Sequence, residues 1–337
     1  MTPQPEDARH MRHALRLAAR GLGNVWPNPA VGCVLLRDGR VVGRGWTQPG
    51  GRPHAERMAL DMAGAAARGA TAYVTLEPCA HHGRTPPCAE ALVAAGVMRV
   101  VSALTDPDPR VSGSGHAILR AAGIAVTEGV LEAEAAVLQA GFLSRVTRGR
   151  PFVTLKLATS FDGRIAMPDG ESRWITGPDA RLHVHAMRAQ HDAIMVGGAT
   201  ARADLPQLNL RGIAAPRQPV RVILSRQALP MLPPEGPEHG PLWHEQGPLD
   251  QVMARLADRG ITRLFCEGGG RLAADLLRAG MVDQLLGYTA GLVLGAEARP
   301  AIGSTGWPSL AAAPRFRLVE TRALGNDVLH RWSAPQP

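Results

Sequence analysis

The chain has 337 residues, of which 45% are hydrophobic and 20% charged, a composition typical of a folded protein with two domains. No apolar run approaches the ~18 residues that a membrane span needs, and four cysteines are too few for a disulfide scaffold in a chain of this length, so we expect a cytoplasmic protein. The net charge of +8 would suit a nucleic-acid partner, but the arginines are scattered and aromatic residues make up only 4%, so we expect neither a nucleic-acid nor a membrane partner.

The first half of the chain alternates predicted helices with predicted strands. Asp38-Gly39 is typical of a two-residue hairpin turn, so the strands that flank it should pair. Strands that alternate with helices of about ten residues favour an α/β fold with helices on both faces of a sheet. In chain order we predict a helix over 6–22, strands over 31–36 and 40–46, a helix over 54–68, a strand over 71–76, a helix over 87–95, a strand over 98–103, and helices over 115–122 and 131–145.

A domain boundary is predicted at the segment Val146-Thr-Arg-Gly-Arg-Pro151, which gives domains of 1–147 and 150–337. A new pattern of strands and helices begins there, and one strand runs directly into Glu267-Gly-Gly-Gly270. Residues 231–248 are rich in proline and glycine and are predicted to form a loop. The other predictions are strands over 152–157, 193–196, 220–224 and 261–266, and helices over 179–189 and 271–279.

The strongest chemical signal is a group of histidine, glutamate and cysteine residues between positions 54 and 88. His54-Ala-Glu56 is followed by Pro78-Cys79 and, after eight further residues, by Cys88. One imidazole and two thiolates would leave the fourth tetrahedral position of a zinc ion open to water, whose pKa zinc lowers to roughly 7. Glu56, at the start of a predicted helix, is the expected proton shuttle, because His-x-Glu followed by two cysteines is typical of zinc-dependent deaminases.

Other interpretations of these residues stay open at this point. A closed structural zinc site could use Cys79, His81, His82 and Cys88, although His54-Ala-Glu56 would then have no role. Cys33 and Cys266 each lie in a predicted strand and are expected to be buried core residues.

Lys156 is the only lysine in the chain, since every other basic side chain apart from histidine is arginine. An ammonium is compact and titratable, whereas a guanidinium is planar and keeps its proton, so Lys156 is a candidate catalytic residue. One alternative is that a single lysine remains in the chain by chance and has no special role. Another is that Lys156 simply forms an ion pair with a carboxylate such as Asp162.

Several segments together point to one family: Trp26-Pro-Asn-Pro-Ala-Val-Gly-Cys33, His54-Ala-Glu56, Pro78-Cys-Ala-His-His-Gly-Arg-Thr-Pro-Pro-Cys88, Lys156-Leu-Ala-Thr-Ser-Phe-Asp-Gly-Arg164, Gly170-Glu-Ser-Arg-Trp174, Arg188-Ala-Gln190, Gly198-Ala-Thr-Ala-Arg-Ala-Asp204, Leu208-Asn-Leu-Arg211 and Glu267-Gly-Gly-Gly270. In these segments the chain resembles the bifunctional riboflavin-biosynthesis deaminase/reductase family. The motifs occur in the same order as in that family and extend over nearly the full length of the chain. The zinc loop is highly specific, and the later motifs are individually weaker.

The resemblance implies a cytidine-deaminase-like, three-layer α/β domain followed by a dihydrofolate-reductase-like domain. It implies zinc-dependent deamination of 2,5-diamino-6-(5-phosphoribosylamino)pyrimidin-4-one, and then reduction of the ribosyl chain to ribityl by NADPH. One zinc ion per chain, NADPH and a phosphorylated pyrimidine are thus the expected ligands, and we expect a homodimer or a higher homo-oligomer.

Carried over residue by residue, the resemblance assigns His54, Cys79 and Cys88 to zinc, Glu56 to proton transfer, Asn28 to the pyrimidine and Arg84 to the ribose phosphate. Lys156 is expected near the cofactor, where it could polarise the carbon that accepts hydride. The positions matching NADP contacts are Ala158, Trp174, Thr200, Asp204, Ser225, Gly269, Gly270, Arg271, Leu272, Ala273, Ala274 and Asp275. The positions matching substrate contacts are Ser172, Arg188, Leu208, Arg211 and Glu267. Arg188 and Arg211 are the expected phosphate ligands, with a surface salt bridge as the alternative role.

Two rival functions remain at this stage. One is a nucleic-acid or free-nucleoside zinc deaminase with a degenerate second domain, which the positive charge would favour. The other is a non-catalytic scaffold stabilised by zinc, which would leave Glu56 and the glycine-rich segment 268–270 without a role.

Overall fold

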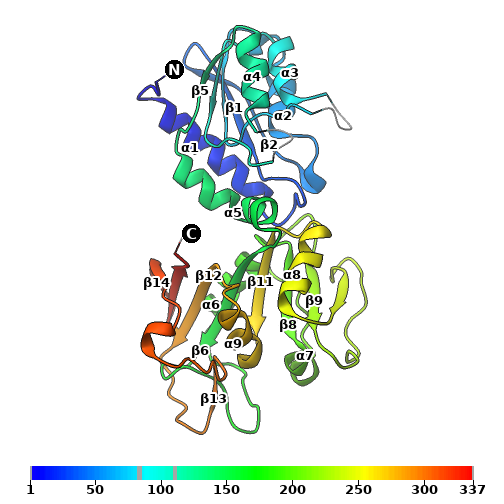
Figure 1. Cartoon of the computed structure of the whole chain (residues 1–337), viewed down its shortest axis with the longest axis vertical. Coiled ribbons are helices and arrows are strands. Elements are labelled where there is room, and N and C mark those ends of the chain that lie inside the picture. The colour runs from blue at the N-terminus through cyan, green and yellow to red at the C-terminus, as the bar shows by residue number, and fades with distance from the viewer. Residues whose placement is uncertain (1, 82–85, 109–111, 336–337) are drawn as a thin grey trace. The chain divides into compact units, whose positions relative to one another are not determined.

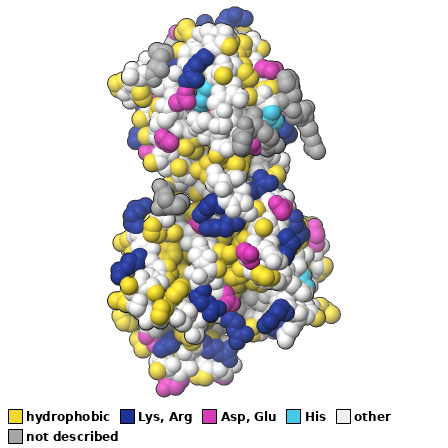
Figure 2. Space-filling view, in the orientation of Figure 1, with side chains coloured by type: hydrophobic (Ala, Val, Ile, Leu, Met, Phe, Trp, Pro, Cys, Tyr) yellow, Lys and Arg dark blue, Asp and Glu magenta, His cyan; other side chains and the backbone are white. Residues whose placement is uncertain are grey.

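The computed structural model describes residues 2–81, 86–108 and 112–335 and divides into two compact units, Met1–Arg150 and Pro151–Pro337, which we call the front and back units. Both are mixed α/β, so the predicted fold class is confirmed (Figure 1). In the part of the chain that is described, no helix is both long and apolar enough to cross a membrane. Lys and Arg side chains occur over the visible face of both units, interspersed with other residue types (Figure 2).

The front unit is built on a five-stranded sheet with three parallel strands. Its order is β2 (Arg40–Trp46), β1 (Gly32–Arg37), β3 (Thr71–Val74), β4 (Arg99–Ser102) and β5 (Ala125–Thr127). The antiparallel pair β1–β2 is the predicted hairpin, and β3, β4 and β5 run parallel. The helices are α1 (Asp7–Ala18), α2 (Ala55–Ala63), α3 (Cys88–Ala94), α4 (Ser114–Ala121) and α5 (Glu132–Arg148), with 3-10 turns η1 (Ala19–Gly21), η2 (Pro49–Gly51) and η3 (Gly64–Ala67).

Two glycines let helices rest directly on opposite faces of this sheet. A Cβ atom at Gly32 would lie 1.9 Å from the Ala14 carbonyl oxygen of α1, and one at Gly45 would lie 2.4 Å from the Ala55 carbonyl oxygen of α2. Gly45 pairs with Cys33, the neighbour of Gly32, and successive strand residues point to opposite faces, so α1 and α2 form the two outer layers. The contact at Gly45 fixes the first turn of α2, which begins directly after His54.

The back unit contains an eight-stranded sheet whose first six strands are parallel. Its order is β10 (Leu242–Glu245), β9 (Val220–Leu224), β8 (Ala193–Gly197), β11 (Arg263–Gly268), β6 (Phe152–Thr159), β12 (Gln284–Ala290), β15 (Asp327–Ser333) and β14 (Arg317–Leu324). The last two strands are antiparallel to their neighbours. The other elements are helices α6 (Pro178–Arg188), α7 (Gly198–Asp204), α8 (Leu249–Asp258) and α9 (Gly270–Arg278), the 3-10 turn η4 (Leu310–Ala312), and the small sheet of β7 (Arg164–Ala166) and β13 (Arg299–Pro300).

The prediction of a continuous loop over 231–248 is wrong, because β10 lies within it and pairs in parallel with β9. Proline and glycine on both sides of this short edge strand hid it from the sequence pattern. The rest of the segment is held by Arg221, a fully buried side chain of β9 whose guanidinium donates to the carbonyl oxygens of Gly240 at 2.9 Å and Pro233 at 2.8 Å.

Cys33 and Cys266 have no exposed surface, so their assignment to the core is confirmed. Cys33 belongs to the front unit's core with Met11, Leu35 and Tyr73.

Candidate active sites

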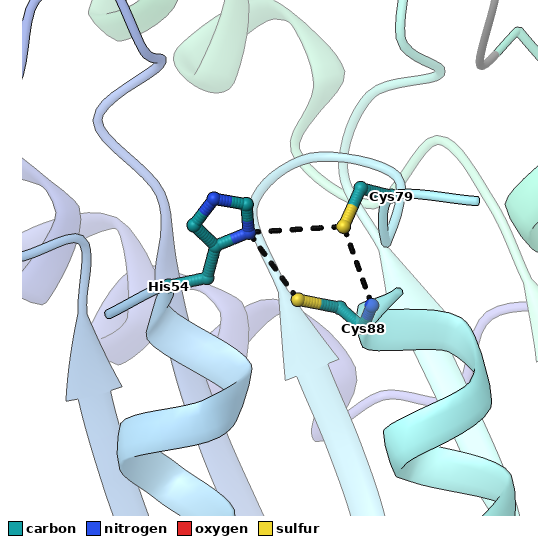
Figure 3. Close-up of side chains that lie close together, drawn as sticks. All are labelled: His54, Cys79 and Cys88. Carbon is teal, nitrogen blue, oxygen red and sulfur yellow. Dashed lines mark hydrogen bonds between the residues drawn. The ribbon is translucent and has the colours of Figure 1, made fainter. Parts of the chain in front are cut away.

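His54, Cys79 and Cys88 converge at one place in the front unit (Figure 3). Their ligand atoms all lie within 4.8 Å of one another. His54 Nδ1 is 3.7 Å from Cys79 Sγ and 3.4 Å from Cys88 Sγ. A tetrahedral zinc ion with ordinary Zn–S and Zn–N distances would hold sulfur and nitrogen about 3.6 Å apart. The three side chains therefore fit a zinc ion with one coordination position left open.

Two of the three residues, His54 and Cys88, lie at the starts of helices, and the third lies in a connecting segment. His54 immediately precedes α2, and Cys88 is the first residue of α3. Cys79 lies in the segment after β3, and its sulfur accepts a hydrogen bond from the Cys88 amide at 3.3 Å. The Cys88 thiol and amide, together with His54, lower the pKa of Cys79 to about 4 against the opposing effect of burial. The cluster thus favours the thiolate, which is the form that binds metal.

The closed site of Cys79, His81, His82 and Cys88 is not the group that the described residues form. His54 joins the two cysteines instead, and His81 is exposed. His82 and Arg84 lie outside the described residues.

Glu56 is in the first turn of α2, two residues after His54, and only 3% of its surface is exposed. Burial, followed by the charge of Cys79, raises the pKa of Glu56 to about 7, and the Cys88 side chain lies within hydrogen-bonding reach of its carboxylate. A carboxyl group poised near neutral pH beside the cluster can both take up and release a proton.

Asn28 lies close to the segment that leads into His54. A Cβ atom at Gly51 would be only 1.8 Å from Asn28 Nδ2, so the turn before His54 packs directly on the amide of Asn28. The Asn28 side chain is half-buried, and its contact with Gly51 puts it three residues along the chain from the zinc-ligand candidate His54.

Glu77 was not singled out from the sequence, although it stands two residues before Cys79. Its buried carboxylate accepts hydrogen bonds from the backbone amides of Asp106 at 3.1 Å, Gly113 at 3.0 Å and Gly115 at 2.9 Å. Glu77 therefore ties the chain that carries Cys79 to the start of α4. Its position directly before Pro78-Cys79 was the available signal.

The back unit contains a large cavity of approximately 2340 Å³. Nearly all the residues that the sequence assigned to cofactor and substrate line it. They are Lys156, Ala158, Ser172, Trp174, Arg188, Thr200, Asp204, Leu208, Arg211, Ser225, Glu267, Gly269, Gly270, Arg271, Leu272 and Asp275. Ala273 and Ala274 are instead buried on the inner side of α9. The cavity is also lined by arginines that the sequence did not single out, among them Arg202 and Arg226.

Lys156, Arg188 and Glu267 form a charged group within this cavity. Lys156 Nζ is 3.8 Å from Glu267 Oε2. Arg188 forms a bidentate ion pair with the same carboxylate, in which its Nε and Nη2 each donate to one oxygen. Burial opposes ionisation of Glu267, but Arg188 and Lys156 outweigh it and lower its pKa to about 2. Burial also lowers the pKa of Lys156, and Glu267 only partly counters this effect.

The carboxylate beside Lys156 is therefore Glu267, and the suggested pairing with Asp162 is wrong. Asp162 instead accepts hydrogen bonds from the Ser160 hydroxyl at 2.6 Å and the Gly295 amide at 2.7 Å. Lys156 and Glu267 meet because β6 and β11 are neighbouring parallel strands.

The glycine-rich segment ends β11 and begins α9. Gly268 and Gly269 have φ values of +94° and +89°, and a Cβ atom at Gly269 would lie 2.6 Å from Thr200 Oγ1. Backbone amides at such a strand-to-helix turn can approach a pyrophosphate closely, and the helix dipole favours the negative charge. The cavity's size and this turn together fit a dinucleotide.

Two family models match the chain in the order expected. Residues 4–104 match the cytidine and deoxycytidylate deaminase zinc-binding region, and residues 151–330 match the RibD C-terminal domain. The riboflavin biosynthesis protein RibD of Escherichia coli is 44% identical over 96% of this chain and 98% of its own length. The RibD of Haemophilus influenzae is 43% identical, with 96% of each chain covered.

Solved structures also match the chain over nearly its full length. Acinetobacter baumannii RibD (form 1) has a TM-score of 0.89 and 41% identity, covering 98% of this chain and 99% of that one. A Thermotoga maritima protein described as a diaminohydroxyphosphoribosylaminopyrimidine deaminase/5-amino-6-(5-phosphoribosylamino)uracil reductase has a TM-score of 0.86 and 35% identity, with the same coverage.

The fold, the metal cluster and these matches define the class: a two-domain enzyme with a zinc-binding deaminase domain followed by a reductase domain. Within that class the chain belongs to the RibD family, the bifunctional deaminase/reductases of riboflavin biosynthesis.

Proposed function

We propose that residues 1–147 deaminate 2,5-diamino-6-(5-phosphoribosylamino)pyrimidin-4-one and that residues 150–337 reduce the product with NADPH, converting its ribosyl chain to ribityl. The single observation that carries this proposal is the convergence of His54, Cys79 and Cys88 to within 4.8 Å, with Glu56 buried beside them. The reductase half rests on the cavity around Lys156 and Glu267 and on the Thermotoga relative's printed activity.

In the deaminase, His54, Cys79 and Cys88 would hold one zinc ion per chain. When bound, zinc supplies Lewis-acid activation of a water molecule. Water adds its oxygen to the ring carbon that bears the amino group, the carbon–nitrogen bond breaks, and ammonia leaves. Glu56 takes a proton from the attacking water and returns it to the departing nitrogen, a role that suits a buried carboxyl with a pKa raised to about 7. Asn28 would hold the pyrimidine, and Arg84 its ribose phosphate.

In the reductase, bound NADPH supplies a hydride to the first carbon of the sugar chain. One proton must reach the sugar oxygen that leaves this carbon, and Lys156 Nζ is the proposed donor. Glu267 orients Lys156, because its carboxylate is 3.8 Å from the ammonium and is itself fixed by Arg188. A lysine whose pKa burial lowers is a better proton donor near neutral pH than an exposed one.

The substrate phosphate of the reductase would bind Arg211 first. Among the described residues its guanidinium makes one hydrogen bond, to the Gln207 side chain at 3.4 Å, which leaves most of its donors available. Arg188 is held by Glu267 and the Asn209 carbonyl and would add charge from a fixed position. Ser172 and Leu208 would complete the substrate contacts.

The cofactor would lie over the glycine-rich turn, in contact with Ala158, Trp174, Thr200, Asp204, Ser225 and the stretch from Gly269 to Asp275. We also propose assembly as a homodimer or a higher homo-oligomer.

Metal analysis combined with an ammonia assay tests this function. The purified chain should contain about one zinc per chain and release ammonia from the diaminopyrimidinone intermediate. Removal of the metal by a chelator should stop ammonia release, and added zinc should restore it. Deamination at an undiminished rate by metal-free protein would refute the proposed deaminase chemistry.

A further inference from the structure

Residues 205–211 follow α7 in the back unit and belong to no helix or strand. Two of them, Leu205 and Leu208, have positive φ values of +43° and +50°. Residues other than glycine rarely adopt this left-handed conformation, and it persists only where the surrounding structure holds it. Leu208 is also almost fully buried, and it lines the cavity together with Arg211. Contacts from outside the segment must therefore fix its backbone.

Helix α6 provides two of these contacts. Arg188 Nη1 donates to the Asn209 carbonyl oxygen at 2.8 Å, and the Arg211 amide donates to His185 Nδ1 at 3.2 Å. A ring nitrogen that accepts a hydrogen bond carries no proton, so His185 is neutral in this arrangement, and burial lowers its pKa in the same sense. Since Arg188 also pairs with Glu267, these bonds connect the segment to the charged group of the proposed reductase site.

Two further contacts come from the chain on either side of β9. Gln218, two residues before β9, accepts a hydrogen bond from the Leu210 amide at its Oε1 atom, at 2.7 Å. Asn209 Nδ2 donates to the carbonyl oxygen of Glu238, between β9 and β10, at 3.1 Å. Residues 209–211 are thus tied to three separate parts of the unit by hydrogen bonds that each involve a side chain. We call these four bonds the 209–211 clamp.

The clamp includes two side chains that do not line the cavity. Leu208 and Arg211 belong to the lining, whereas Asn209 and Gln218 do not. Asn209 is only 4% exposed, and Gln218 is half-buried. A substitution at Gln218 therefore acts on a ligand in the cavity through the backbone of the segment rather than through a direct contact.

We propose that Gln218 and Asn209 are positioning residues of the reductase, which hold the 205–211 segment in the conformation that presents Leu208 and Arg211 to the substrate. Buried backbone amides need a hydrogen-bonding partner, and at Leu210 Gln218 supplies it in place of a neighbouring strand. The inference rests on the proposed reductase function and adds to it the residues that place the substrate contacts.

The cofactor should depend much less on this clamp. Thr200 and Asp204, the proposed cofactor contacts that precede the segment, lie on α7. Helix α7 has backbone hydrogen bonds of its own, which do not involve Gln218. Loss of the clamp should therefore raise KM for the substrate and leave KM for NADPH and kcat nearly unchanged.

Gln218→Leu and Gln218→Glu test the proposal, with the deaminated intermediate as substrate and NADPH as reductant. Leucine is similar in size but cannot accept from the Leu210 amide, whereas glutamate keeps an acceptor oxygen. Gln218→Leu should raise KM for the intermediate about 5- to 100-fold, the expected effect of leaving a buried amide without its partner, and change kcat and KM for NADPH less than about twofold. Gln218→Glu should keep KM for the intermediate within about threefold of the wild-type value.

Two further variants complete the test. Asn209→Asp keeps the size of the side chain but cannot donate to the Glu238 carbonyl oxygen, so it should raise the same KM. Gln251→Leu is the matched control, because this exposed glutamine lies on α8 and outside the cavity lining. It should leave all three constants unchanged.

Hydrogen exchange of the backbone amides, measured without substrate, separates this inference from the proposed function. The peptide that contains Leu210 and Arg211 should exchange at least tenfold faster in Gln218→Leu than in the wild type or Gln218→Glu, while peptides from β6 and β11 stay unchanged. If exchange responds in this way but the wild type does not reduce the intermediate, the reductase proposal fails and the clamp stands. A wild-type KM in Gln218→Leu, an equally raised KM in Gln218→Glu, or faster exchange throughout the back unit overturns the positioning role.

Discussion

Replacing Lys156 with arginine separates a proton donor from a simple ion-pair partner. Lys156 Nζ is 3.8 Å from Glu267 Oε2, and only 16% of its side chain is exposed. Arginine would keep the positive charge and could still pair with Glu267, so the fold and NADPH binding should survive. What changes is acidity, because a guanidinium holds its proton far above neutral pH, whereas burial lowers the pKa of Lys156.

The expected loss follows from that difference. General acid catalysis contributes about 10²- to 10⁴-fold in rate, which is about 2.7–5.5 kcal/mol of transition-state stabilisation. Lys156→Arg should therefore slow ribosyl reduction by at least about 100-fold. The wild-type rate should also fall as pH rises through the Lys156 pKa, which lies below the ordinary lysine value of 10.5, since the proton donor is then lost.

The assay follows NADPH absorbance with the deaminated intermediate as substrate, and ammonia release from the diaminopyrimidinone serves as the control. Deamination should be unaffected, because the metal cluster belongs to the other unit. If the arginine variant reduces its substrate within a few-fold of the wild-type rate, Lys156 is only an ion-pair partner of Glu267, and the proton-donor role is refuted.

Three further changes test other parts of the account. Cys88→Ala should strip the zinc and abolish deamination while reduction continues, and full zinc occupancy in that variant would refute the ligand set. Glu56→Gln should keep zinc but lower ammonia release by about 10²- to 10⁴-fold, because an amide cannot carry the proton; a loss below about fivefold would remove Glu56 from the mechanism. Burial lowers the pKa of His191 to about 3, so below pH 6.5 the unfolded chain binds a proton that the folded chain does not. His191 alone should therefore cost about 1.4 kcal/mol of folding stability when the pH is lowered to 5.5, which the urea midpoint of reductase activity measures. His191→Gln should weaken the loss of stability at low pH by this amount, while His183, His185 and His330, whose pKa values burial also lowers, keep their own contributions; an identical pH profile in the variant would contradict the prediction.

The metal cluster could be predicted from the sequence because its residues stand in short motifs, two of them at the starts of helices. His54 directly precedes α2 and Cys88 begins α3, so local spacing carried most of the information. The chain's last strands gave no such signal: β14 is an exposed edge strand in which most side chains face solvent, so its residues do not alternate between apolar and polar. Helix α8 was also missed, although Leu249, Val252, Met253 and Leu256 have helical spacing.

The partners of the charged residues could not be predicted, because tertiary contacts bring them together. Arg188 and Glu267 are 79 positions apart, and Glu267 meets Lys156 only through the pairing of β11 with β6. The sequence suggested Asp162 for Lys156 because it is near in the chain. Similarly, Arg202 approaches Ser225 only because α7 and β9 are consecutive elements of one βαβ unit.

The ratio of ammonia released to NADPH oxidised, starting from the diaminopyrimidinone intermediate, tests the central claim of two successive reactions most directly. Without NADPH, ammonia release should proceed at its full rate and the aminouracil should accumulate. With NADPH added, one NADPH should be oxidised for each ammonia released, and the Glu56→Gln variant should oxidise NADPH only when the deaminated intermediate is supplied. Oxidation of NADPH by that variant with the undeaminated intermediate, at the wild-type rate, would contradict the order of the two reactions and the division of labour between the two domains.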